Sequence, residues 1–78
     1  MITITIKTNN IRKTVVEPIT ETPASIFQSI GITPTERNQV SLSGSVLDGN
    51  ELNKTFAELG IIEDEEVTLS SIIKGDGA

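Results

Sequence analysis

The side chains that most often carry out catalysis or hold metal ions are missing from this sequence. It contains no Cys and no His, so it offers no thiol nucleophile, no imidazole general base and no ligand pair for zinc. Hydroxyl groups are present at Ser41, Ser43, Ser45, Ser70 and Ser71. Without a histidine to activate them, we interpret these serines as solvent-facing strand positions. The sequence predicts no enzymatic activity, no metal site and no cofactor.

The acidic run Glu63–Glu66 is the densest group of carboxylates in the chain. A calcium loop requires oxygen ligands at alternating positions, a glycine turn and a distal glutamate, and this run does not have that layout. No other pair of carboxylates is placed in an apolar segment, as acid–base catalysis would need. We therefore interpret the run as a solvated turn.

Charge and length limit the partners that the chain can have. Six Lys and Arg against eleven Asp and Glu give a net charge of -5, and the 78 residues suffice for one small domain. A negative chain repels phosphate backbones and anionic lipids, so nucleic acids and membranes are not expected partners. Neither a signal peptide nor an apolar run of the ~20 residues needed to cross a bilayer is recognised. We expect a cytoplasmic monomer.

The first element that could position these side chains is a strand at the start of the chain. Isoleucines alternate with polar residues over residues 1–8, at Ile2, Ile4 and Ile6, which predicts a strand with one buried face. Asn9-Asn10 then suits a tight hairpin turn, because asparagine tolerates positive φ.

A second strand is expected over residues 11–17, ending before Pro18. Its buried face is ambiguous, since Ile11 and Val15 share one face while Thr14 and Val16 share the other. A bulge could reconcile the two alternatives.

A short helix is predicted over residues 23–30. Thr22 is a good N-cap, Pro23 fits the first helical position and Gly31 fits the C-terminal cap. Ile26 and Ile30 are four residues apart and lie on one face with Phe27 beside them, so this face should pack on the sheet.

The second half of the chain alternates short strands with turns. We expect strands over 40–42, 46–47 and 67–73, with turns at Ser43-Gly44 and Asp48-Gly49. A helical turn should carry Leu52, Phe56 and Leu59, and two isoleucines should enter the core, at positions 61 and 62.

This order of elements predicts an α+β domain over residues 1–73, with a flexible, glycine-containing tail over 74–78. The sheet should be mixed, with four to five strands and one short helix packed across it. The first and last strands are the most apolar and should lie beside each other at its centre.

The sequence resembles the ubiquitin-like family, whose fold is the β-grasp, over nearly its whole length. The most specific stretch is Val40–Leu52, VSLSGSVLDGNEL, which resembles the family's strand, glycine turn, strand, Asp-Gly turn and core leucine. Further matches are found at Thr55–Ile61, Val16–Pro18 and Gly31–Pro34. The resemblance implies a β-grasp fold.

The resemblance also locates the surface that ubiquitin receptors read. Its three positions fall near Asn9, at Ser41 and at Ser70, and all three are polar here. Little apolar area is left to bury, so we expect an interaction surface with partners of its own. At two further positions the residue differs from the one that is typical of the family. Ile72 occupies the position of the tail arginine, and Ser45 occupies that of the main linkage lysine.

The tail, Lys74-Gly-Asp-Gly-Ala78, leads to the functional hypothesis of a protein modifier. Glycine lacks a Cβ and lets enzymes approach a terminal carboxylate closely. Trimming of Ala78 would expose Gly77, and trimming from Asp76 onward would expose Gly75. The resemblance implies activating, conjugating and deconjugating enzymes as partners, target proteins of unknown identity, and a bacterial source. Lysines that could accept isopeptide bonds are Lys7, Lys13, Lys54 and Lys74.

Two alternatives remain open at this point. The first is a non-covalent interaction module that uses its sheet face or an edge strand. The second is a sulfur carrier of the molybdopterin or thiamine type, which ranks last because such carriers end in two glycines and this chain does not.

Overall fold

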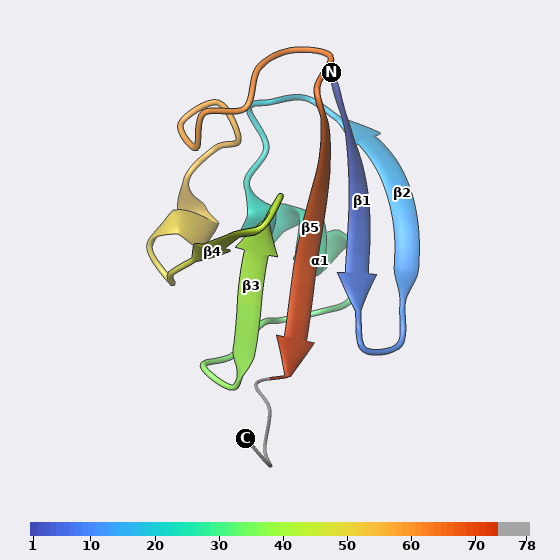
Figure 1. The fold of residues 1–78 in the computed structure, drawn as a ribbon, viewed down its shortest axis with the longest axis vertical. Helices are drawn as coiled ribbons and strands as arrows, with labels where there is room; N and C mark the ends of the chain where they lie inside the picture. The colour runs from blue at the N-terminus through green and yellow to red at the C-terminus, as the bar shows by residue number, and fades with distance from the viewer. Residues whose placement is uncertain (74–78) are drawn as a thin grey trace.

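A five-stranded mixed sheet with one α-helix across one face forms the framework in the computed structural model, which describes residues 1–73 (Figure 1). The elements are β1 (Ile2–Thr8), β2 (Arg12–Glu17), α1 (Pro23–Ser29), β3 (Asn38–Leu42), β4 (Ser45–Leu47), the 3-10 helix η1 (Glu51–Asn53) and β5 (Glu66–Ile73). The strand order is β2-β1-β5-β3-β4. β1 and β5 are parallel, and the other neighbours are antiparallel. The predicted α+β class and the adjacent first and last strands are confirmed.

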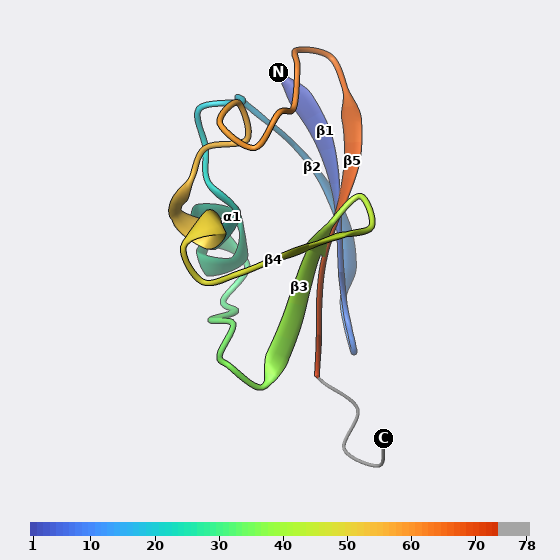
Figure 2. The same ribbon diagram turned by 60° about the vertical axis from the view of Figure 1, so that its left-hand side comes forward.

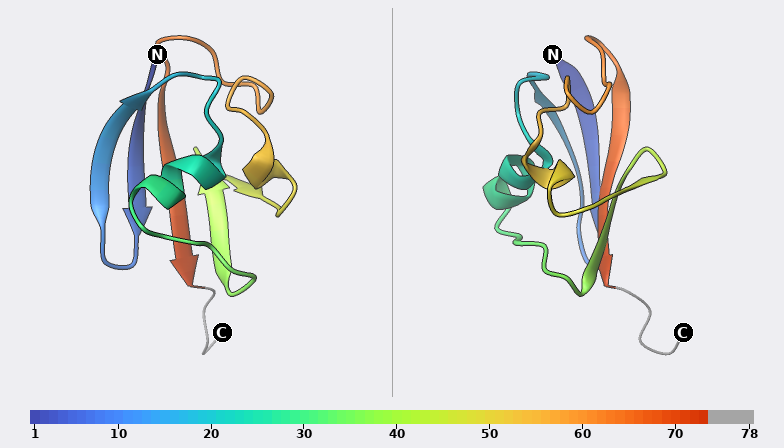
Figure 3. Two further views of the ribbon diagram at one scale, coloured as in Figure 1. Left: turned by 180° about the vertical axis from the view of Figure 1, so that it is seen from behind. Right: turned by 90° about the vertical axis from the view of Figure 1, so that its left-hand side faces the viewer.

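The core lies between the sheet and α1. Ile2, Ile4 and Ile6 of β1 are buried as predicted, and the register places Val67 and Leu69 of β5 beside the last two. Figure 2 and Figure 3 show α1 on one side of the sheet, while the other side stays open. The remaining core residues come from the helix, β3, β4 and the segment after η1, and they are Ile26, Phe27, Val40, Leu42, Leu47 and Phe56.

The β1–β2 hairpin resolves the ambiguity of the second strand without a bulge. The register runs unbroken from Ile2↔Glu17 to Lys7↔Arg12. Val15 therefore packs against the core, whereas Val16 lies on the open face and is 56% exposed.

The mechanism proposed for the hairpin turn is wrong. Among the described residues, positive φ occurs at glycines and at Ser43 and Asp64, and neither asparagine of the turn adopts it. The turn is closed instead by Thr8, whose Oγ1 accepts hydrogen bonds from the backbone N–H groups of Asn10 and Ile11 at 3.2 and 2.9 Å.

Both ends of α1 are capped as the sequence predicts. Thr22 accepts a hydrogen bond from the Ser25 N–H at 3.1 Å, and the Ser25 hydroxyl accepts one from the Thr22 N–H at 3.2 Å. This reciprocal capping box compensates for the short length of the helix. At the other end, Gly31 has φ +79°, and the Ile32 N–H donates to the Phe27 carbonyl, which is a Schellman ending.

The two core isoleucines expected after the helical turn behave differently. Ile61 packs against the core, but Ile62 is 66% exposed, so its predicted burial is wrong. The helical turn is also shorter than expected, because η1 stops at Asn53 and Phe56 lies beyond it. The Ile61 N–H donates to the Phe56 carbonyl, and this tight turn directs only the first isoleucine inward.

The acidic run is a turn followed by the first residue of β5. Asp64 sits at its tip with φ +65°, and Glu66 begins the strand. Glu63 accepts a hydrogen bond from the Met1 amino group at 2.6 Å, and both side chains are exposed. The interpretation as a solvated turn is confirmed.

Ser71 departs from the interpretation of the serines as solvent-facing. It lies on the buried face of β5 with 2% exposure, and its hydroxyl has no hydrogen-bond partner within residues 1–73. A buried polar group without a partner costs about 1–3 kcal/mol.

Ser71→Ala should therefore raise the free energy of unfolding by about 1 kcal/mol, measured by urea denaturation. The control is Ser70→Ala, which removes the hydrogen bond between the Ser70 and Ser41 hydroxyls and should destabilise. A loss of stability in Ser71→Ala would contradict this prediction.

A second capping box, between Thr55 and Glu58, makes stability depend on pH. The Glu58 carboxylate accepts the Thr55 N–H at 2.9 Å, and this backbone bond, helped by the Thr55 hydroxyl, lowers the pKa of Glu58 below its ordinary value of 4.5. The contribution is present above the unfolded-state pKa and is lost as pH falls through the lower folded-state pKa. Urea unfolding across this acid range should show the wild type losing more stability than Glu58→Gln. Identical pH profiles for the two proteins would refute the assignment.

Candidate functional site

The open face of the sheet, opposite α1, carries two of the three positions expected to form the interaction surface. Ser41 and Ser70 are register partners on β3 and β5, and their hydroxyls share a hydrogen bond. Because both side chains are small and end in hydroxyl groups, this central part of the open face presents little apolar surface. Both side chains are only half-buried.

Asn9 lies at the end of the sheet instead of within the serine pair. Its Oδ1 accepts a hydrogen bond from the Ile73 N–H at 3.0 Å, which ties the β1–β2 turn to the last residue of β5. Ser41 and Ser70 are therefore in direct contact, whereas Asn9 contacts Ile73 at the end of β5. The sequence alone could not reveal this contact, since the two residues are 64 positions apart.

The end of β5 is the place from which the tail continues. β5 pairs with β1 on one side and with β3 on the other, and Figure 1 shows its end beside the β1–β2 turn, far from Met1. Ile72 and Ile73 are 48% and 51% exposed there. The residues expected to act in conjugation and processing lie outside the described residues, and they are Gly75, Asp76, Gly77 and Ala78, together with Lys74.

The lysines expected to accept isopeptide bonds are exposed but point to separate surfaces. Lys7 of β1 lies on the open face opposite Arg12, whereas Lys13 of β2 pairs in register with Ile6 and so lies on the helix side. Lys54 follows η1. Their amines are thus accessible from three directions, and nothing in the geometry singles out one of them.

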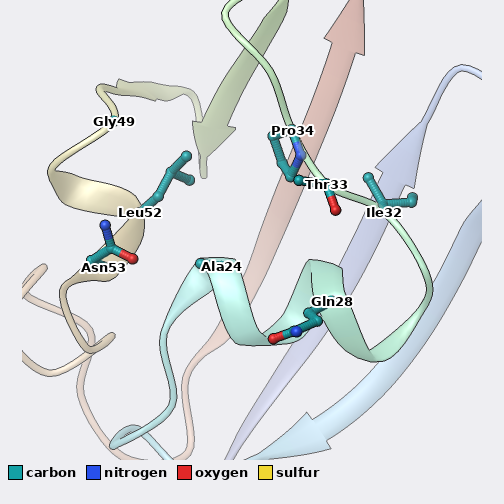
Figure 4. A pocket seen from close by; sticks show the side chains of 8 residues that line it. All are labelled: Ala24, Gln28, Ile32, Thr33, Pro34, Gly49, Leu52 and Asn53. Carbon is teal, nitrogen blue, oxygen red and sulfur yellow. The ribbon is translucent and has the colours of Figure 1, made fainter.

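A hollow on the helix side was not anticipated from the sequence. It has a volume of about 260 Å³ and lies between α1, the segment after it and η1 (Figure 4). Its lining is Ala24, Gln28, Ile32, Thr33, Pro34, Gly49, Leu52 and Asn53. These side chains are apolar, amide or hydroxyl groups, so the hollow offers neither an acid nor a base for catalysis. Its parts come from distant segments, and no local pattern could have revealed it.

Neither a metal site nor a membrane-spanning helix is found among the described residues. Within residues 1–73 no three His, Cys, Asp or Glu side chains gather closely enough to hold a metal ion. No helix in this part is long and apolar enough to cross a membrane.

Comparison with known proteins found no family model and no curated protein that matches the chain. The function is therefore inferred from the geometry and from the sequence.

Proposed function

We propose that this chain is a β-grasp protein of the ubiquitin-like type, attached to other proteins through a glycine carboxylate of its tail. The strand order β2-β1-β5-β3-β4 supports this proposal, together with the parallel pairing of the first and last strands. α1 follows the β1–β2 hairpin and crosses one face of the sheet. This arrangement is compatible with the β-grasp that the sequence resembles.

The position of the tail is the single observation on which the modifier function depends. The glycine-containing sequence follows directly after β5, a strand held on both sides by neighbours and fastened at Ile73 by Asn9. A preorganised base of this kind lets a partner enzyme hold the domain while it works on the residues that follow in the sequence. Gly75 and Gly77 both suit a narrow enzyme groove because neither has a Cβ.

The proposed chemistry uses the carboxylate as its only reactive group. An activating enzyme would join it to the adenylyl group of ATP with release of pyrophosphate, and an enzyme thiol would then displace AMP to form a thioester. The amine of a target lysine would attack the thioester, form the isopeptide bond and release the thiol. The chain itself supplies only the carboxylate and the docking surface, so the proposal includes no enzymatic activity of its own.

The proposed partners are dedicated activating, conjugating and deconjugating enzymes. The polar Ser41–Ser70 pair supports this, because receptors that read an apolar patch would find little to bury there. A bacterial cytoplasm is the proposed setting, on the strength of the resemblance alone.

The test is an intact mass spectrum of the protein produced together with the products of its neighbouring genes. The proposal predicts loss of either Ala alone or Asp-Gly-Ala from the end of the chain, accompanied by species of higher mass. An untouched mass with no adducts would overturn it. A terminal thiocarboxylate would overturn it in favour of a sulfur carrier.

A non-covalent interaction module is the second candidate, and the edge of the sheet favours it. β2 has a neighbour on one side only and exposes Val16 on the open face, which leaves backbone groups available to another strand. The untouched mass, together with a stable complex, is the result that this alternative predicts.

A further inference from the structure

Positive charge is concentrated in the first two strands of a negative protein. Residues 1–16 contain Lys7, Arg12 and Lys13 and no acidic residue, although the whole chain carries six basic against eleven acidic side chains. Such segregation is unusual for a solvated surface, where charges of both signs are normally mixed.

The sheet register assembles two of these cations into a row that crosses all five strands. Arg12 is the partner of Lys7, Lys7 of Ser70, Ser70 of Ser41, and Ser41 of Val46. Residues paired in register point to the same face, and all five lie on the open face. We call this set the cross-sheet row.

The Lys7–Arg12 pair is unfavourable within the isolated domain. Like charges directly opposite each other in a sheet destabilise it. Among the strand residues that the structure describes, the carboxylate on the open face is that of Glu66, four positions before Ser70 on β5. Four residues of strand span about 13 Å, which exceeds the screening length of about 8 Å at physiological salt. Within residues 1–73 no ion pair involves either cation.

Apolar side chains accompany the cations on the same face. Val46, at the other end of the row, is 62% exposed, and Ile72, two residues beyond Ser70 on β5, is 48% exposed. Both are thus available for contact with a partner. A partner that fits this face needs carboxylates for Lys7 and Arg12 and an apolar side chain for Ile72.

We propose that the Lys7–Arg12 end of the cross-sheet row binds an acidic segment of a partner protein, with an apolar side chain of that segment packed on Ile72. A protein segment fits better than a nucleic acid, because two cations are few for a phosphate backbone and because a protein segment can also supply the apolar side chain that packs on the exposed Ile72. This inference does not depend on covalent attachment of the tail, so it stands or falls separately from the proposed function.

The test is a nuclear magnetic resonance titration of the ¹⁵N-labelled full chain with a synthetic peptide of Asp, Glu and Ser residues around one Leu. We expect amide shifts to change at Lys7, Arg12, Ser70 and Ile72. The double variant Lys7→Gln/Arg12→Gln should bind at least about tenfold more weakly, a difference of roughly 1.4 kcal/mol. The matched control Lys54→Gln, which removes a distant exposed lysine, should bind like the wild type.

Three results would overturn the proposal. One is equal binding of a control peptide in which every carboxylate is replaced by its amide. Another is unchanged affinity in the double variant. The third is tighter binding of a single-stranded oligonucleotide than of the acidic peptide.

Lys7→Gln alone should raise the urea midpoint of unfolding by removing the repulsion from Arg12. A lower midpoint would contradict the repulsion on which the inference rests.

Discussion

The proposed function predicts that replacement of the tail glycine that carries the carboxylate by valine abolishes attachment to other proteins. The groove of an activating enzyme must accept the residue that carries the carboxylate, and a branched side chain would hold catalytic groups away from the carbonyl. Gly77→Val distinguishes the two candidates, because it should abolish attachment if Gly77 is the processed end and leave it unchanged if trimming exposes Gly75. Gly75→Val should impair attachment in both cases, since Gly75 would lie in the groove either way. The measurement is the amount of high-mass adduct detected with an antibody against an added tag.

Variants that end at Gly77 or at Gly75 serve as controls for this prediction. The one that already exposes the correct glycine should form adducts without the processing protease, and the other should not. Formation of normal adducts by both valine variants would contradict the assignment of the carboxylate to either glycine.

The largest expected effect on stability comes from Phe27→Ala. Phe27 is fully buried on α1, and its carbonyl accepts the hydrogen bonds that close the helix. Truncation of a buried phenylalanine costs about 3–5 kcal/mol. A chain of 78 residues has about 4–12 kcal/mol of stability in total, at 0.05–0.15 kcal/mol per residue. The variant should therefore lose a large share of its folded population at moderate temperature.

Ile62→Ala is the matched control, because Ile62 is a large apolar residue that is 66% exposed. Its effect should stay within about 0.5 kcal/mol. Both variants can be followed by circular dichroism during urea unfolding, which needs no tryptophan. Similar losses of stability for the two variants would contradict the burial of Phe27 in the core and the exposure of Ile62.

The sequence was informative wherever a local pattern determines the structure. The alternating Ile2, Ile4 and Ile6 predicted a strand with one buried face, and Thr22 and Gly31 marked the two ends of α1. These features depend on side chains a few residues apart, whose preferences act before any tertiary contact forms.

Features that depend on pairing between distant strands could not be predicted. The buried face of β2 was ambiguous because its two candidate faces carry similar apolar side chains, and only the register with β1 places Val15 inside. The exposure of Ile62 depends on the turn at Phe56 in the same way. A shift of one residue in register would reverse every side chain of a strand.

The candidate interaction surface likewise combines residues that the sequence indicates with a contact that only strand pairing creates. The sequence indicates Ser41 and Ser70 as surface positions, and the two residues meet on the open face. The cation pair beside them has no signal of its own in the sequence, because Lys7 and Arg12 become neighbours only through the hairpin register.

The most direct test of the central claim is peptide mapping of the adducts formed with the neighbouring gene products. After digestion, the proposed function predicts a branched peptide in which the carboxyl group of Gly75 or Gly77 forms an isopeptide bond with a lysine of another protein. Recovery of the tail as an unbranched peptide that still ends in Ala78, from cells where the complete set of enzymes is active, would contradict it.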